Sequence, residues 1–134
     1  MNCIFCKIVR KEIPAKIIGE NEVALAFLDI MPRSPGHTLI IPKNHYTSLL
    51  EVPDSELEPL FKLTKEMIAL IKKKLQASGF TVGYNHGKVA GQEIDHFHIN
   101  VIPRYQGDGG IAIQGVVDYK TGESLDEVFK KLKE

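Results

Sequence analysis

Residues 95–104 read Asp-His-Phe-His-Ile-Asn-Val-Ile-Pro-Arg, so polar side chains alternate with large apolar ones. Successive side chains of a β-strand point to opposite faces, and this alternation predicts a strand over residues 95–105. One face of that strand, directed at the core, carries Phe97, Ile99 and Val101. The other face carries His96, His98 and Asn100, with neighbours about 6–7 Å apart. We interpret the two imidazoles as part of one site and not as ordinary polar residues of a solvated sheet face.

The pattern of the remaining chain predicts an α+β fold. Four further strands are predicted at residues 15–20, 22–29, 37–43 and 80–85. Apolar residues recur at helical spacing over 55–78, where Ser55 and Glu58 are expected to form a capping box and Gly79 to end the helix. A short amphipathic helix is expected from about Ser124. The grouping of strands around one long helix indicates an antiparallel sheet with that helix packed on it and a short C-terminal helix.

Length and composition exclude several classes of protein. A chain of 134 residues fits one domain, which we assign to residues 1–134. Its 17 basic and 17 acidic residues balance, which is unlike a protein that binds long nucleic acid, so any nucleotide bound is expected to be small. We find no apolar run long enough for a membrane helix and no signal-peptide pattern. The expected location is the cytoplasm, without a membrane partner.

The two cysteines of the chain are Cys3 and Cys6, in a segment over residues 3–11 that we interpret as turn-like. They lie too close together to staple a fold as an extracellular disulfide framework would. Two chemical interpretations stay open, a redox couple or half of a tetrahedral zinc site. A redox motif should follow a strand, but only Met1 and Asn2 precede Cys3. Zinc is therefore favoured.

These segments together resemble the histidine triad family. Residues 96–102 match its pattern of His-x-His-x-His followed by apolar residues, except that Asn100 stands in the third position. Residues 27–30 and 35–43, and then Asn85 with 90–92, look like the other characteristic blocks of the family in the same order. The resemblance extends from about Cys3 to Arg104.

The resemblance implies a catalytic role for His98. This middle histidine would attack the α-phosphorus of a nucleotide in line and carry a covalent nucleotidyl group that water then hydrolyses, without magnesium. Asn100 would stand near the phosphate as a hydrogen-bonding group that cannot shuttle a proton. His37 would support the phosphate site. The turn at Ala90-Gly91-Gln92 is interpreted as a phosphate loop and not as an ordinary tight turn, because Gly91 permits close approach and Gln92 can donate hydrogen bonds.

The resemblance also implies how the nucleoside is bound. Asp29 would accept hydrogen bonds from the ribose hydroxyls, since an ionised carboxylate only accepts. Asn85 aligns with a nucleotide-contacting position, as does Glu93, where many relatives carry a hydroxyl. Four residues occupy positions that are similar to the base pocket of the family, although such residues are also common in a core. They are Phe5, Ile8, Phe27 and Ile30.

Some branches of the family, including the uridylyltransferases, join a cysteine pair to two histidines. The corresponding positions here are His45 and His96. Two thiolates and two imidazoles would complete four ligands with no open position, which is typical of a structural zinc site. The implied ligand set is thus Cys3, Cys6, His45 and His96.

The leading hypothesis is a hydrolase that acts on nucleoside phosphoramidates or dinucleoside polyphosphates, with adenosine as the expected base. One alternative is a nucleotide-binding or partner-binding protein with little catalysis. Another is a nucleotidyltransferase, because the transferase branch has a neutral Gln where Asn100 stands, although transferases combine two such units. A homodimer is also expected, because the family pairs chains through a strand edge and the long helix. The apolar residues expected to contribute surface are Phe61, Met67 and Ile68.

Overall fold

The computed structural model describes residues 2–133 and contains a five-stranded antiparallel sheet. The strand order is β1-β2-β3-β5-β4. The strands are β1 (Ile17–Glu20), β2 (Ala24–Leu28), β3 (Thr38–Pro42), β4 (Gly79–Gly83) and β5 (Ile99–Arg104). The helices are α1 (Ile4–Val9), α2 (Asp54–Leu75) and α3 (Leu125–Lys133), with short 3-10 turns η1 (Leu49–Glu51), η2 (Lys88–Ala90) and η3 (Ile113–Gly115). The predicted α+β fold is confirmed.

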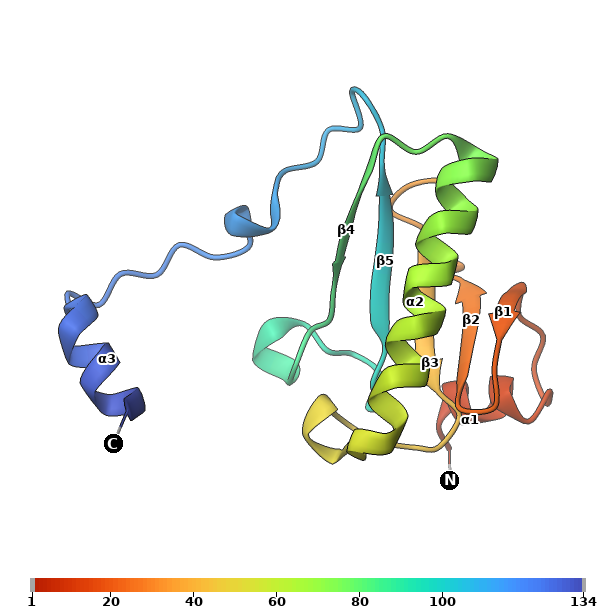
Figure 1. Cartoon of the computed structure of the whole chain (residues 1–134), viewed down its shortest axis with the longest axis horizontal. Coiled ribbons are helices and arrows are strands. Elements are labelled where there is room, and N and C mark those ends of the chain that lie inside the picture. The colour runs from red at the N-terminus through yellow and green to blue at the C-terminus, as the bar shows by residue number, and fades with distance from the viewer. Residues whose placement is uncertain (1, 134) are drawn as a thin grey trace.

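The long helix α2 covers one face of the sheet (Figure 1). Its buried apolar stripe meets the apolar side of β5, so Phe97, Ile99 and Val101 lie in the core as predicted. The side chains that α2 contributes are Leu60, Leu63, Met67 and Ile71. Burial of this stripe holds the helix on the sheet, since apolar area removed from water stabilises by roughly 25 cal/mol per Å². The expectation that Met67 supplies exposed surface is wrong, because its side chain is part of this core.

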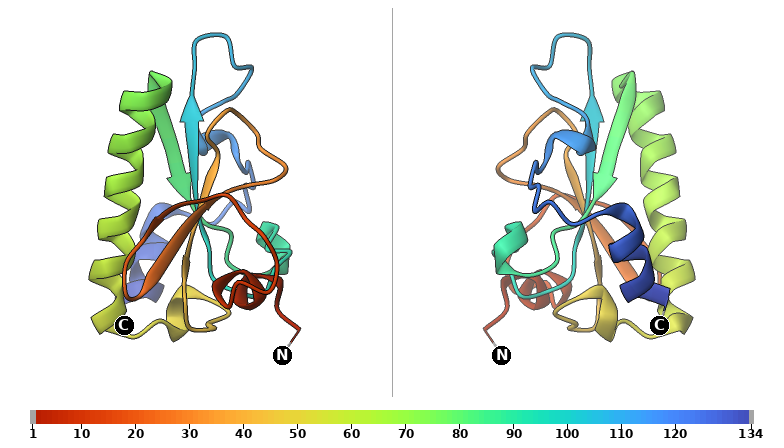
Figure 2. Two further views of the ribbon diagram at one scale, coloured as in Figure 1. Left: turned by 90° about the vertical axis from the view of Figure 1, so that its right-hand side faces the viewer. Right: turned by 90° about the vertical axis from the view of Figure 1, so that its left-hand side faces the viewer.

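The other face of the sheet is covered by α1, which lies across the sheet from α2 (Figure 2). Phe5 and Ile8 of α1 pack there against apolar residues of β2 and β3, including Phe27. The prediction of a turn-like segment over residues 3–11 is wrong, because residues 4–9 are helical. The Cys3 sulfur accepts a hydrogen bond from the Cys6 N–H and caps the first turn. The two thiols thus lie close together at the start of the helix.

The ends of α2 differ from the predicted signals. The helix begins at Asp54 after Pro53, and no side chain caps it by a hydrogen bond, so the predicted capping box does not form. The helix ends at Gln76, which adopts the left-handed conformation with a φ of 58°, while Gly79 already belongs to β4. The amide of Gln76 bonds to the Lys72 carbonyl. This bond satisfies a backbone carbonyl at the end of the helix. Glycine is the usual residue in this left-handed position.

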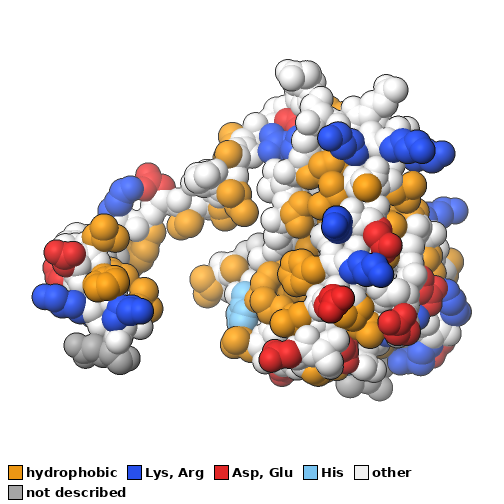
Figure 3. Space-filling model, viewed as in Figure 1, with side chains coloured by type: hydrophobic (Ala, Val, Ile, Leu, Met, Phe, Trp, Pro, Cys, Tyr) orange, Lys and Arg blue, Asp and Glu red, His pale blue; other side chains and the backbone are white. Residues whose placement is uncertain are grey.

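The chain beyond β5 extends away from the sheet and ends in α3 (Figure 1). The predicted helix near Ser124 is confirmed, since Ser124 and Glu127 bond to each other's backbone N–H groups in a capping box. Every described residue from Gln106 onward is exposed. Figure 3 shows hydrophobic side chains both on the face of the molecule that α2 covers and along this tail. Within residues 2–133, no helix is long and apolar enough to cross a membrane.

Candidate functional site

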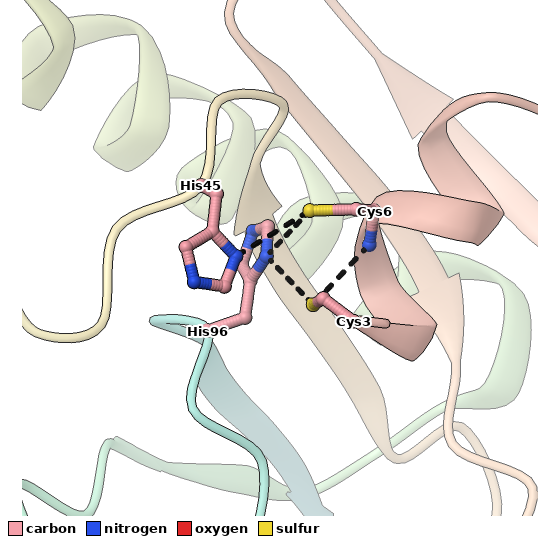
Figure 4. Close-up of side chains that lie close together, drawn as sticks. All are labelled: Cys3, Cys6, His45 and His96. Carbon is pink, nitrogen blue, oxygen red and sulfur yellow. Dashed lines mark hydrogen bonds between the residues drawn. The ribbon is translucent and has the colours of Figure 1, made fainter. Parts of the chain in front are cut away.

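Four potential metal ligands converge on the sheet face that carries α1 (Figure 4). Cys3 and Cys6 come from the start of α1, His45 from the loop after β3, and His96 from the segment before β5. The Cys3 sulfur lies 3.4 Å from Nδ1 of His96, and the Cys6 sulfur lies 3.4 Å from Nδ1 of His45 and 3.6 Å from Nδ1 of His96. All four ligand atoms lie within 4.8 Å of one another. The group can hold a metal ion.

The His96 side chain is oriented for metal binding. Its Nε2 donates to the Pro42 carbonyl at 2.8 Å, so Nδ1 is left with a lone pair that faces the thiols. The ring is fully buried, and burial lowers its pKa from 6.5 to about 4. The neutral form required of a ligand is therefore favoured at neutral pH. Burial, followed by the neighbouring Cys3, raises the pKa of the Cys6 thiol, an effect that a bound cation would oppose.

His98 lies two residues further along, immediately before β5 and not within it as predicted. Its Nδ1 donates to the backbone carbonyl of His96 at 2.8 Å. The proton is thus on Nδ1, and Nε2 carries a lone pair. The ring is partly exposed, with its centroid 5.2 Å from that of Phe5. This arrangement provides what a nucleophilic imidazole requires, one nitrogen held and the other available.

Asn100 of β5 and His37, immediately before β3, form a hydrogen-bonded pair of polar side chains. His37 precedes β3, and its Nδ1 accepts the N–H of Arg33 at 3.1 Å. A nitrogen that accepts carries no proton, so Nε2 donates, and it lies 2.8 Å from Oδ1 of Asn100. The carboxylate of Asp29 is 3.7 Å from the same Nε2. The structure thus joins three of the predicted site residues, Asp29, His37 and Asn100.

The buried Gln92 amide has a different arrangement from the predicted one. Its Nε2 donates to the carbonyls of Thr47 and Ile94 at 2.8 and 3.1 Å, and its Oε1 accepts the N–H of Gly87 at 2.9 Å. Both N–H bonds of the amide are used. The prediction that Gln92 donates to a phosphate is therefore corrected, because its amide crosslinks the backbone of the loop.

The loop before Gln92 brings Gly91 close to Asn85. Gly91 has a φ of 103°, which favours glycine, and a side chain added there would lie 3.5 Å from Nδ2 of Asn85. Asn85 and the loop are thus neighbours. Glu93 is exposed.

The residues proposed for a base pocket separate into two groups. Phe5 and Phe27 meet edge to face with ring centroids 5.5 Å apart, and they share a buried cluster with Ile8. Ile30 is 89% exposed and belongs to the loop after β2. The structure therefore brings the first three together, with Phe5 against the ring of His98, while Ile30 does not join their cluster.

The particular backbone groups that orient the site histidines were not identified from the sequence. They are the carbonyls of Pro42 and His96 and the N–H of Arg33. Every residue carries a backbone carbonyl, and every residue except proline a backbone N–H, so no residue type could have signalled these contacts. Only the folded arrangement assigns them.

The match to a family model is the decisive comparison with known proteins. Residues 10–107 match the family model described as HIT domain, which is most of the chain. The chain belongs to the histidine triad (HIT) family.

Relatives within the HIT family match nearly the whole chain. An uncharacterized HIT-like protein of Methanocaldococcus jannaschii is 49% identical over 131 residues, which cover 98% of each chain. An adenosine 5′-monophosphoramidase of Saccharomyces cerevisiae is 35% identical over 130 residues, covering 97% of this chain and 80% of that protein.

Solved structures of HIT proteins have the same fold. A HIT family member from Bacillus subtilis superposes with a TM-score of 0.86 at 32% identity and covers 99% of this chain and 94% of its own. A zinc-bound histidine triad protein from Mycobacterium smegmatis gives 0.76 at 37% identity, covering 81% and 79%.

Proposed function

We propose that this HIT protein hydrolyses nucleotidyl compounds at the α-phosphorus, with adenosine as the preferred base. The observation that carries the proposal is the orientation of His98, whose Nδ1–H is held by the His96 carbonyl while Nε2 keeps its lone pair. The activity named for the yeast relative, that of an adenosine 5′-monophosphoramidase, agrees with this chemistry. Nucleoside phosphoramidates and dinucleoside polyphosphates are the two candidate substrate classes.

The proposed reaction has two steps. Nε2 of His98 attacks the α-phosphorus, a bond from Nε2 to phosphorus forms, and the bond from phosphorus to the leaving group breaks with its electron pair on the leaving group. Water then attacks the phosphorus of the nucleotidyl-histidine, the bond from phosphorus to Nε2 breaks with its electron pair on Nε2, and a proton of the water passes to solvent as the nucleoside monophosphate leaves. The hydrogen bond to the His96 carbonyl stabilises the positive charge that develops on the ring.

The nucleoside would lie over the sheet face that carries α1. We propose that Asp29 accepts from the ribose hydroxyls and that Phe5, Ile8 and Phe27 contact the base. Asn85 and Gly91, which lie side by side, would approach the phosphates. Gln92 would fix the shape of that loop through its three backbone contacts. Ile30 would reach the base only from an exposed loop.

We propose zinc as the metal, in a structural role. A tetrahedral zinc ion, with bonds of about 2.3 Å to sulfur and 2.0–2.1 Å to nitrogen, separates sulfur from nitrogen by about 3.5–3.6 Å. The separations of 3.4 to 3.6 Å between the thiols and imidazoles agree with that geometry. Four protein ligands leave no position for substrate, so the ion would hold His96 and thereby the carbonyl that orients His98. Two free thiols also suit a reducing compartment such as the cytoplasm.

We further propose one domain over residues 1–134 and a homodimer. The tail has no core of its own, because its described residues are exposed. Phe61 on α2 is 50% exposed and lies on the helix expected at the dimer interface. Light scattering at micromolar concentration should give twice the mass of the chain, and a monomer would contradict the dimer.

The proposed function is tested by product formation from a panel of substrates. Adenosine and guanosine phosphoramidates and dinucleoside polyphosphates are incubated with purified protein, and nucleoside monophosphate is measured. We expect adenosine monophosphate to form without added magnesium. Binding of adenosine monophosphate without turnover of any substrate would instead indicate a binding protein. Transfer to an added acceptor in preference to water would indicate a transferase.

A further inference from the structure

We infer that His37 fixes the amide of Asn100 with its NH2 group toward the phosphate, and that the site consequently prefers leaving groups that depart as stable anions. The expected substrates are nucleotidyl anhydrides, in which the leaving group is a phosphate or a carboxylate, and not alkyl phosphoramidates. The inference rests on the proposed hydrolysis at the α-phosphorus and narrows its substrate class.

The first step is the direction of the hydrogen bond between the two side chains. The Arg33 N–H occupies the Nδ1 lone pair of His37, so the ring holds its proton on Nε2. This N–H can bond only to an acceptor, and Oδ1 of Asn100 lies at hydrogen-bond distance, 2.8 Å, whereas the carboxylate of Asp29 is 3.7 Å away. An amide turned by 180° would place NH2 against N–H, which is unfavourable. His37 therefore sets which end of the Asn100 amide faces the site.

The second step is where the other end of the amide lies. The Asn100 backbone is paired on both sides, with Leu39 of β3 and Gly83 of β4, so the side chain leaves a rigid strand. Phe97, Ile99 and Val101 all pack in the core with α2, so His98 and Asn100, which alternate with them, lie on the other side of the chain. Within residues 2–133, Nδ2 of Asn100 donates no hydrogen bond to the protein, and the side chain is only partly buried. Two N–H bonds are available to a phosphate beside His98.

The third step concerns the proton that a leaving group needs. An amide donates hydrogen bonds but does not give up a proton near neutral pH. The imidazole of His37 is 4% exposed and its Nε2–H is already bonded to Asn100, and His96 is fully buried among the thiols. In the part of the chain that is described, the imidazoles next to His98 are thus occupied. Water is the proton source that remains.

The consequence differs between the two classes of substrate. When the phosphorus–oxygen bond of an anhydride breaks, the electron pair stays on a phosphate or carboxylate, which is stable as an anion. When the phosphorus–nitrogen bond of an alkyl phosphoramidate breaks, the electron pair stays on an amide anion unless a proton arrives. The Asn100 amide can stabilise charge on the phosphate in both cases. Only the second case needs the general acid that this site lacks.

The first experiment measures single-turnover rates for a matched series of adenylyl substrates. The series contains the p-nitrophenyl and phenyl esters of adenosine monophosphate and its N-alkyl phosphoramidate, and the proteins are the natural chain and Asn100→His. For the natural chain we expect rates to fall steeply as the leaving group becomes more basic. Asn100→His should raise the ratio of the alkylamide rate to the p-nitrophenyl rate by about 10²–10⁴-fold. An unchanged ratio between the two substrates would overturn the inference.

A double-mutant cycle tests His37 as a positioning residue. His37→Phe should lower turnover of the p-nitrophenyl ester by about 10–100-fold in the natural chain, since a misdirected amide loses its bond to the charged phosphate. In an Asn100→Ala background the same change should have no further effect. Equal losses in both backgrounds would show that His37 has only a structural role, and would overturn the inference that it positions the Asn100 amide. No release of p-nitrophenol by the natural chain would instead refute the proposed hydrolysis, and this inference with it.

Discussion

His96 and His98 are two residues apart and have the same side chain, yet the surroundings of their ring nitrogens differ. Both nitrogens of His96 are engaged, Nε2 by the Pro42 carbonyl and Nδ1 by the thiols, and the ring is fully buried. His98 is held through Nδ1 alone and is partly exposed. The second nitrogen decides the role: where it is enclosed the imidazole can bind a metal, and where it is open it can react.

The two sites are also connected. The His96 side chain is one of the four potential metal ligands, while its backbone carbonyl orients the ring of His98. A change in the position of His96 therefore reaches both. Substitution of His98 and removal of the potential metal should therefore affect different quantities. The first should lower turnover, and the second should lower the free energy of unfolding.

The largest effect is expected from His98→Ala, which removes the imidazole with the open nitrogen. The variant should keep its fold and its affinity for adenosine monophosphate and lose turnover by roughly 10⁴-fold or more, because it lacks the group that forms the covalent bond. Steady-state kinetics and calorimetry measure the two quantities. His86→Ala is the matched control, an exposed histidine bonded to Tyr84, and should stay near the natural rate. Near-normal turnover of the His98 variant would refute its role.

The group of potential metal ligands around the enclosed His96 is tested by removal of the metal. Zinc at about a thousand times its Kd adds roughly 4 kcal/mol to the free energy of unfolding, so Cys6→Ser should lose about that amount. Elemental analysis should find one zinc per natural chain and none in the variant. Chemical denaturation gives the stability, with the natural chain treated with chelator as the control. A natural chain that contains no zinc after growth in zinc-replete medium would contradict the metal site.

A smaller effect is expected when pH alters the charge of His96 in the metal-free protein. Burial lowers its pKa in the folded state to about 4, whereas in the unfolded chain the ordinary value of 6.5 applies. The unfolded state therefore binds more protons between these values. The contribution of His96 leaves the free energy of unfolding at its highest above pH 6.5. That free energy then falls by about 3 kcal/mol as pH falls toward 4, at about 1.4 kcal/mol per pKa unit.

Denaturation at several pH values measures this loss. His86→Ala should keep the same slope, since that histidine is exposed. A stability that is constant between pH 6.5 and 4 would contradict the burial of a neutral His96.

The smallest effect should follow truncation after Val117, which removes α3. Every described residue in the removed segment is exposed, so the free energy of unfolding should change by less than about 0.5 kcal/mol. Turnover by His98 should persist, because the site lies in the sheet. Thermal denaturation and kinetics of the truncated chain measure both quantities. A large loss of stability would place the tail in the folded core.

The fold was predictable because its signals are local. Alternation identified β5, and helical spacing identified α2, since each pattern reflects burial of one face. The errors occur where tertiary contacts decide. α1 forms around a thiol cap and buried Phe5, Gln76 takes the position expected for a glycine, and Met67 enters the core.

The candidate site was predictable in its residue types and less so in their arrangement. The four potential metal ligands were all named from the sequence, and they do converge. The crosslinking role of Gln92 and the direction of the His37–Asn100 bond depend on backbone groups of residues distant in the sequence, such as Thr47. No residue pattern encodes such groups, so the hydrogen-bond directions had to come from the structure.

The central claim is that the open nitrogen of His98 forms a bond to phosphorus, and trapping that species tests it most directly. The protein is mixed with the p-nitrophenyl ester of adenosine monophosphate, quenched within one turnover under alkaline conditions, digested and examined by mass spectrometry. We predict one added adenylyl group on the peptide that contains His98, and none in His98→Ala. Full turnover with no adenylylated peptide at any quench time, or the group on another residue, would contradict the account.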